Sequence, residues 1–315
     1  MLAGEAIVDV VMRVPALPER GGDVLATRGV ITVGGGFNVM AAAARQGMPV
    51  LYAGGHGTGP WGDLVRMTLA AEGIEILRQP DPARDTGFDV ALVEPDGERS
   101  FVTHLGAEAL REPGSWGAVP VQDGDFVYVS GYGLVPAESG PILGEWAAGL
   151  PDGAALILDP GPLVAQIPGE VLGPVLDRCD WLSCNAREAL ALAGEAVEVG
   201  EAVAADEPRL SAVARALRDR TARASVLVRD GATGCLLAPR ASAVTRILTP
   251  EVQAVDTTGA GDAHSGVFLA GLAEGASPAR AARRANAAAA ISVTRHGPAT
   301  SPTRAELDAW LARYP

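Results

Sequence analysis

Residues 256–272 read DTTGAGDAHSGVFLAGL, a glycine-rich segment that leads directly into an apolar helical stretch. Gly259, Ala260 and Gly261 have little or no side chain, so their backbone N–H groups can converge at the helix start. Those donors and the positive end of the helix favour a bound anion such as a phosphoryl group. Asp262 then stands beside the anion site, where its carboxylate can accept a hydroxyl proton. The alternative is an aspartate placed at a helix N-terminus for dipole reasons alone.

The composition narrows the class of partner. The 315-residue chain has a formal net charge of −13, whereas nucleic-acid binding needs clustered cations. All 25 basic residues are arginine, so the chain has neither a Schiff-base lysine nor a Walker-A lysine. The three cysteines form no CxxC pair, and no apolar run is long enough to span a membrane. We therefore expect a cytoplasmic protein with a small-molecule substrate and no nucleic-acid or membrane partner.

Apolar strands alternate with helical stretches along most of the chain, which predicts an α/β fold with a doubly wound, mostly parallel sheet flanked by helices. We expect one domain over residues 1–315. The apolar run LAGEAIVDVVM, residues 2–12, is typical of a buried parallel strand with Asp9 near its carboxyl end. Segments 12–33 and 86–106 contain short β-prone pieces and turns instead, and predict a small β lid.

A second glycine cluster, Gly34-Gly35-Gly36, comes just before Phe37 and Asn38. Gly34 and Gly35 allow the backbone to approach a polyol closely, and Asn38 can both donate to and accept from a hydroxyl. A flexible loop followed by an asparagine cap is the alternative. The spacing of Asn185 and Glu188 likewise suits either a functional pair on one helical face or a simple helix cap.

The 256–272 stretch resembles the C-terminal signature of the ribokinase-like (PfkB) carbohydrate kinase family, which also includes adenosine kinases. The resemblance covers the chain from Gly4 to about Pro302. It implies a ribokinase-like fold and ATP-dependent transfer of the γ-phosphoryl group to a hydroxyl of a small sugar or sugar-like acceptor. In that family, the residues that correspond to Asp262 and to Gly259, Ala260 and Gly261 are the base and the anion hole. Acceptor binding would involve Asp9, Gly34, Gly35 and Asn38.

The same resemblance implies sites for the nucleotide and for cations. The nucleotide residues would be Asn185, Arg229, Gly231, Gly234 and Asn286, and Glu188 would organise Mg²⁺. Some family members also hold K⁺, for which the matching positions are Asp256, Thr258, Ser292, Arg295, Gly297 and Ser301. Ile7 and Ser130 stand where ribokinases commonly have an asparagine and an acidic residue. The identity of the sugar therefore stays open.

Two other functions and an assembly are compatible with these motifs. A nucleoside kinase of the same family would need an aromatic side chain to stack on the base, for which Phe37 and Tyr132 are candidates. A ligand-binding protein that kept the fold and lost catalysis is a different class. The edges of the lid sheet also suggest a homodimer formed through the lid.

Overall fold

The computed structural model describes residues 1–109, 114–195 and 206–313. Its large sheet has the strand order β13-β12-β11-β10-β9-β8-β1-β4-β5. The pairs from β11 to β5 are parallel, and the β11-β12 and β12-β13 pairs are antiparallel. The strands are β1 (Leu2–Ala3), β4 (Leu51–Tyr52), β5 (Glu75–Ile76), β8 (Phe126–Ser130), β9 (Ala155–Asp159), β10 (Trp181–Asn185), β11 (Ser225–Arg229), β12 (Cys235–Ala238) and β13 (Thr245–Ile247).

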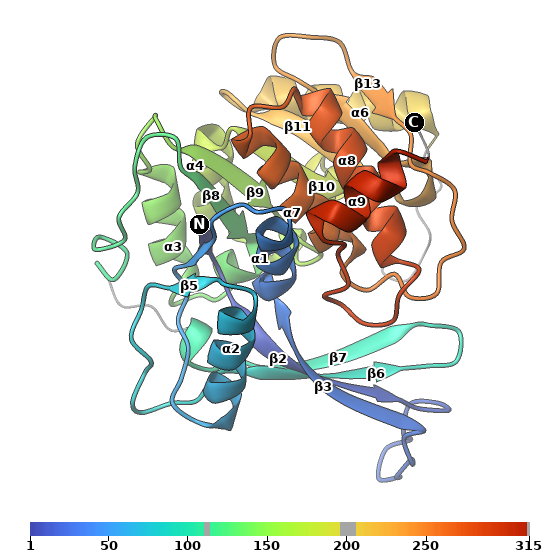
Figure 1. Ribbon diagram of the computed structural model, residues 1–315. Helices are drawn as coiled ribbons and strands as arrows, with labels where there is room; N and C mark the ends of the chain where they lie inside the picture. Colours follow the sequence, from blue (N-terminus) through green and yellow to red (C-terminus); the bar gives the residue numbers. More distant parts are fainter. Residues whose placement is uncertain (110–113, 196–205, 314–315) are drawn as a thin grey trace.

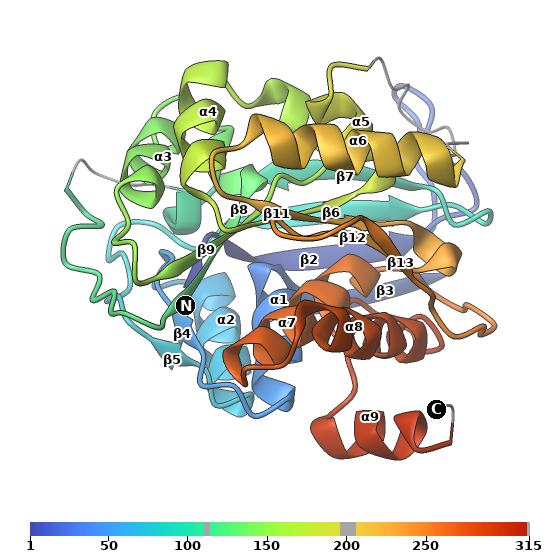
Figure 2. The same cartoon turned by 90° about the horizontal axis from the view of Figure 1, so that it is seen from above.

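Helices cover both faces of this sheet, which confirms the doubly wound α/β fold (Figures 1 and 2). One face carries α3 (Gly140–Ala148), α4 (Gly169–Arg178), α5 (Ala186–Leu192) and α6 (Glu207–Arg220). The other carries α1 (Gly36–Arg45), α2 (Pro60–Ala71), α7 (Ala260–Ala273), α8 (Pro278–Ser292) and α9 (Arg304–Leu311). Apolar side chains of the strands and of these helices form the buried core on each side. No helix in the described ranges is long and apolar enough to cross a membrane.

Local sequence signals account for these elements. The runs FVYVS and ALILD are apolar up to their last residue, as expected of strands buried on both faces, and they form β8 and β9. Helix α8 begins where Ser277 accepts a hydrogen bond from the Arg280 N–H. Helix α9 begins with a capping box between Thr303 and Glu306. Turn and cap chemistry therefore sets where the helices start, and packing orders them around the sheet.

A second sheet of four strands, which we call the small sheet, projects from one edge of the body (Figure 1). Its order is β3-β2-β6-β7, with bounds Arg28–Gly35, Ala6–Arg13, Phe88–Val93 and Arg99–His104. The expected segment 86–106 contains β6 and β7. The expectation that the run 2–12 forms one buried strand of the large sheet is wrong. Only Leu2 and Ala3 of this run enter the large sheet, and strand β2 of the small sheet begins at Ala6. Asp9 therefore lies in the middle of a small-sheet strand, because a continuous apolar run does not reveal where the chain changes sheets.

Candidate active site

Asp262 lies in the first turn of α7, in the space between that helix and the small sheet, where its charge raises the pKa of Asp9. Gly259 caps this helix in the left-handed conformation with φ 73°, and a side chain there would overlap the Pro298 carbonyl. The first turn leaves the amides of Gly261 and Asp262 without an intrahelical partner, so they are available to an anion. The Nδ2 group of Asn38 donates to Asp262 Oδ2 at 3.0 Å. Burial raises the pKa of Asp262 to about 6, against the lowering effect of the Asn38 hydrogen bond.

The small sheet brings a second carboxyl pair to the same space. Asp9 of β2 and Asp89 of β6 are direct neighbours in the parallel register. Burial raises the pKa of both groups, and the charge of Asp89 raises that of Asp9 further, so the pair holds a proton near neutral pH. Gly34 packs against Asp9 so closely that a Cβ atom would overlap the carboxylate. Gly34 therefore makes room for Asp9.

Two buried oxygens in this space have no hydrogen-bond partner within the described structure: Asn38 Oδ1 and Asp89 Oδ1. A buried acceptor without a donor costs free energy, about 1–3 kcal/mol for a typical group. Hydroxyl groups of a bound polyol would supply the missing donors. The combination of Asp9, Asp89 and Asn38 thus fits an acceptor with several hydroxyls.

Arg229, at the end of β11, forms a buried ionic cluster beneath the start of α7. Its Nη1 donates to Asp159 Oδ2 at 2.8 Å, and its Nη2 lies 3.6 Å from Glu188 Oε2. The same Nη1 also contacts the hydroxyl groups of Ser183 and Ser265 at 2.7 and 3.0 Å. Burial lowers the pKa of Arg229, but the two acids outweigh it and the pKa is raised overall. The predicted nucleotide residue is therefore a cation held within the protein, below Gly261.

Asn185 and Glu188 cap helix α5 by bonding each other. The Asn185 N–H and Nδ2 both donate to the Glu188 carboxylate at 2.7 Å, and the Glu188 N–H donates to Asn185 Oδ1 at 2.9 Å. The helix-cap interpretation thus describes their geometry, and it leaves the carboxylate next to Arg229. Burial and the charge of Asp159 raise the pKa of Glu188 to about 7. No group of three or more His, Cys, Asp or Glu side chains suited to a metal occurs in the described residues.

The six residues predicted for K⁺ lie in two segments, the loop 256–258 and the stretch 292–301, which begins at the last residue of α8. Asp256 joins these segments, because its carboxylate accepts from the Thr258 N–H at 3.0 Å and from the Gly297 N–H at 3.2 Å. Burial opposes ionisation of Asp256, but these hydrogen bonds lower its pKa. The Ser301 hydroxyl is buried and has no hydrogen-bond partner in the described part of the chain. That free oxygen is compatible with a cation ligand.

The remaining residues predicted to bind the nucleotide differ in their surroundings. Gly231 and Gly234 flank an exposed turn with φ of 54° and 95°, conformations that glycine adopts readily. Asn286 is buried instead, and its Nδ2 donates to the carbonyl of Ile247 at 2.8 Å. Its Oδ1 lies 3.1 Å from His264 Nε2, and burial lowers the pKa of His264 to about 3, so the ring is neutral. The amide of Asn286 is therefore already engaged in holding β13 against α8.

Sequence reasoning missed two acids of the site, Asp89 and Asp159. Asp89 is the one acidic residue in strand β6 (FDVALV), in which buried positions alternate with less buried ones. It shares the buried face of the strand with Ala91 and Val93. Asp159 ends the apolar strand ALILD. Ligands of open α/β sheets bind at the carboxyl ends of the strands, so that position was a usable signal.

The chain is similar to known proteins over almost its whole length. The pfkB family carbohydrate kinase model matches residues 1–305. The chain belongs to this family. It is 32% identical to the uncharacterized sugar kinase YegV of Escherichia coli, over 98% of this chain and 92% of that protein. An adenosine kinase of Schizosaccharomyces pombe is 27% identical over 78% of this chain and 74% of its own length.

A solved structure of a family member shows the same fold. The ribokinase of Cryptococcus neoformans in complex with ADP has a TM-score of 0.78 and 25% identity, covering 99% of this chain and 98% of that one. The protein is thus a phosphotransferase with an alcohol group as acceptor, in the class of ribokinase-family sugar or nucleoside kinases. Its ribokinase-like fold is the one expected from the sequence.

Proposed function

We propose that the protein transfers the γ-phosphoryl group of ATP to a hydroxyl of a small sugar or sugar-like acceptor. The observation that carries this proposal is that Asp262, bonded to Asn38 at the start of α7, lies near enough to Asp9 for its charge to raise the pKa of Asp9, and that Asp89 is the direct neighbour of Asp9. One side of this space offers donors for a phosphoryl group, and the other offers acceptors for several hydroxyls. Asp262 lies where the two sides join.

In this proposal Asp262 accepts the proton of the attacking hydroxyl, and Asn38 keeps its carboxylate aligned. The turn of Gly259, Ala260 and Gly261 presents the unpartnered amides of Gly261 and Asp262, which stabilise charge that develops on the transferred group. Arg229 adds positive charge below the same turn, since a Cβ at Gly261 would lie 3.5 Å from its Nε. The nucleotide would lie against the Gly231–Gly234 turn. The backbone at Asn185 and at Asn286 would flank the nucleotide on the same side.

Magnesium bound with the nucleotide would supply positive charge for the phosphates in this proposal. Glu188, whose carboxylate faces Arg229 at the end of the large sheet, would hold it through water. The 256–258 and 292–301 segments would hold K⁺ and so stiffen the anion hole, which is supported by the free hydroxyl of Ser301. Neither ion replaces Asp262 as the proton acceptor.

The nucleoside alternative is weaker because the two stacking candidates differ in exposure. Phe37 is only 3% exposed and packs in the core, so it cannot stack on a base. Tyr132 is 51% exposed and remains a candidate. The dense set of hydroxyl-binding groups at Asp9 and Asp89 favours a sugar. A non-catalytic role is disfavoured because Asp262 and its anion site are intact.

The small sheet would act as a lid over the acceptor and, by its outer face, as a dimer contact. Ile31 and Val102 on that face are 54% and 72% exposed, although they are apolar. Strands β3 and β7 are its free edges. We expect a homodimer by analytical ultracentrifugation and a monomer for Ile31→Asp. A cytoplasmic location is supported by three buried, unpaired cysteines.

The testing experiment measures ADP formation with pentoses, hexoses, sugar acids, sugar phosphates and nucleosides, each with and without K⁺. We expect turnover on a sugar class, and loss of that turnover by about 10² or more in Asp262→Asn. Turnover confined to nucleosides would select the alternative. Bound ATP without turnover on any acceptor would contradict the proposal.

A further inference from the structure

The inner face of the small sheet is arranged in three chemically distinct rows. The strand register places Thr32, Asp9 and Asp89 side by side in the first row. Two residues further along the strands, Val30, Val11, Ala91 and Phe101 form an apolar row. Another two residues along, the third row contains Arg28, Arg13, Val93 and Arg99. One cavity includes members of all three rows.

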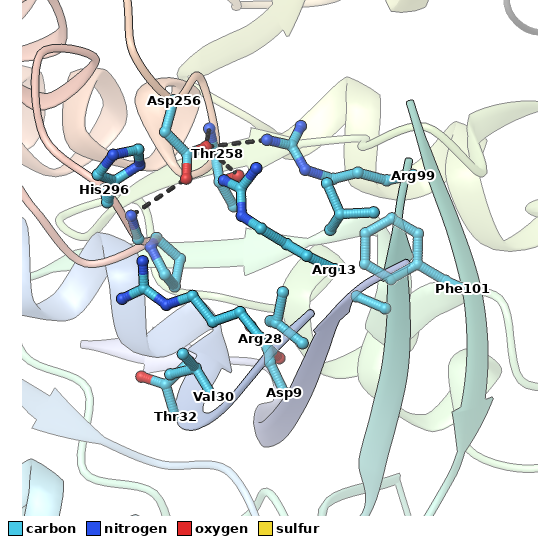
Figure 3. A pocket seen from close by; sticks show the side chains of 15 residues that line it. Asp9, Arg13, Arg28, Val30, Thr32, Arg99, Phe101, Asp256, Thr258 and His296 are labelled. Atoms are coloured by element: carbon cyan, nitrogen blue, oxygen red, sulfur yellow. Dashed lines mark hydrogen bonds and ion pairs between the residues drawn. The ribbon is translucent and has the colours of Figure 1, made fainter. Parts of the chain in front are cut away.

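The arginines of the third row extend toward the 256–258 and 296–298 loops, which form the opposite wall of the cavity (Figure 3). Arg99 forms an ion pair with Asp256 at 2.9 Å. The guanidinium groups of Arg13 and Arg28 form no hydrogen bond or ion pair with any residue that the structure describes. These two arginines are also direct partners across the antiparallel β2-β3 pair. Like charges directly opposite each other destabilise a sheet, and an anion bound between these two exposed arginines would relieve their repulsion.

This uncompensated charge is unusual in a chain with a net charge of −13. An arginine pair is well suited to a planar carboxylate or to a phosphate, because each guanidinium can donate two parallel hydrogen bonds. Arg13 and Arg28 line the same cavity as Asp9, which is predicted to bind the acceptor substrate. Gly231 and Gly234, on the predicted nucleotide side, do not line that cavity. The geometry therefore favours an anion on the acceptor over the nucleotide phosphates.

We infer that the acceptor carries an anionic substituent, a phosphate or a carboxylate, which Arg13 and Arg28 bind. This inference rests on the proposed kinase function and names its substrate class. Asp9 and Arg13 are four residues apart on one strand, about 13 Å, a gap that the long arginine side chain shortens. The hydroxyls of the acceptor then face Asp9 and Asp89, its carbon skeleton lies on Phe101 and Val30, and its anion is distal to the reacting hydroxyl.

The test compares neutral sugars with their monophosphates and with the matching sugar acids, in steady-state kinetics at saturating ATP. The variants are Arg13→Met, Arg28→Met and the double variant, since methionine keeps an apolar stem without charge. Arg20→Met is the matched control, because Arg20 is exposed in the loop between β2 and β3 and does not line the cavity. Circular dichroism and thermal melting establish that each variant is folded.

We expect kcat/KM for one anionic class to exceed that of its neutral counterpart by about 100-fold or more. Each single variant should lose about 10- to 100-fold on that class, within the range for hydrogen bonds to charged groups, and Arg20→Met should lose nothing. The monophosphate and sugar-acid arms tell which anion is bound. A preference for neutral sugars, or a double variant that changes only the KM for ATP, would overturn the inference while leaving the kinase function intact. Absence of turnover on every acceptor would overturn the kinase function itself, and this inference with it.

Discussion

Replacement of Asp262 by asparagine should make the protein more stable while it abolishes catalysis. Burial raises the pKa of Asp262 to about 6, whereas the unfolded chain has a value near 3.9. Between about pH 4 and pH 6 the folded protein thus keeps a proton that the unfolded chain has lost. As pH rises through that window, ionisation of the Asp262 carboxyl lowers the free energy of unfolding. This loss of stability is complete above pH 6.

The difference between the unfolded value near 3.9 and the folded value of about 6 corresponds to at most roughly 3 kcal/mol, because the Asp262 carboxylate is partly exposed. Asparagine has the same shape, stays neutral, and can still accept the hydrogen bond from Asn38 through its own oxygen. For a chain of 315 residues, recovery of this free energy raises Tm by about 3–5 °C at pH 7. At pH 4 the two proteins should melt at nearly the same temperature.

The assay is thermal melting of both proteins without ligands from pH 4 to pH 8, together with the pH profile of kcat. Wild-type kcat should fall about tenfold per pH unit below pH 6, since only the ionised carboxylate accepts a proton. The Asn variant should lose about 10² or more in kcat with little change in acceptor binding. A variant that is less stable at pH 7 would refute the stated electrostatic cost, and near-normal turnover would refute the base assignment.

Two further substitutions test the groups around Asp262. Gly34→Ala should raise the acceptor KM at least about tenfold without changing the ATP KM, because the added methyl displaces the Asp9 carboxylate. Gly29→Ala in the same strand is its control, since a Cβ there meets nothing within 4 Å. Arg229→Met should lower stability by about 3–5 kcal/mol in denaturant unfolding, because it leaves buried acids unpaired. Adding Asp159→Asn should recover part of that loss, and full additivity of the two changes would contradict the ionic cluster.

The sequence sufficed for the elements that depend on local chemistry. Strands β8 and β9 coincide with the mainly apolar runs at 126–130 and 155–159, and helix α9 begins at the capping box of Thr303 and Glu306. The glycine-rich segment was also readable as a helix start, and α7 begins at Ala260 with Gly259 in the left-handed conformation. Features with a local cause can be predicted from local sequence.

The sequence did not reveal which residues meet across the cleft. Asp9 was placed at the end of a core strand, and its partner Asp89 was not found, since their contact depends on the register of β2 with β6. The nucleotide role given to Arg229 from resemblance likewise did not anticipate its contacts with Asp159 and Glu188, which lie 70 and 41 positions away. Such ion clusters are set by packing of distant strands, and a single sequence carries no signal for that.

The division of the site between two sheets has a consequence for how it would close. Asn38 and Asp262 belong to α1 and α7, which pack against each other on the body, whereas Asp9 and Asp89 belong to the small sheet. Without an acceptor, this space holds raised-pKa carboxyls and the unpartnered oxygens of Asn38 and Asp89. Hydroxyl donors from an acceptor satisfy groups on both sides at once, so binding favours an arrangement in which the two sheets are close. In the proposed reaction this would exclude water, which competes with the hydroxyl for the phosphoryl group, when the acceptor is present.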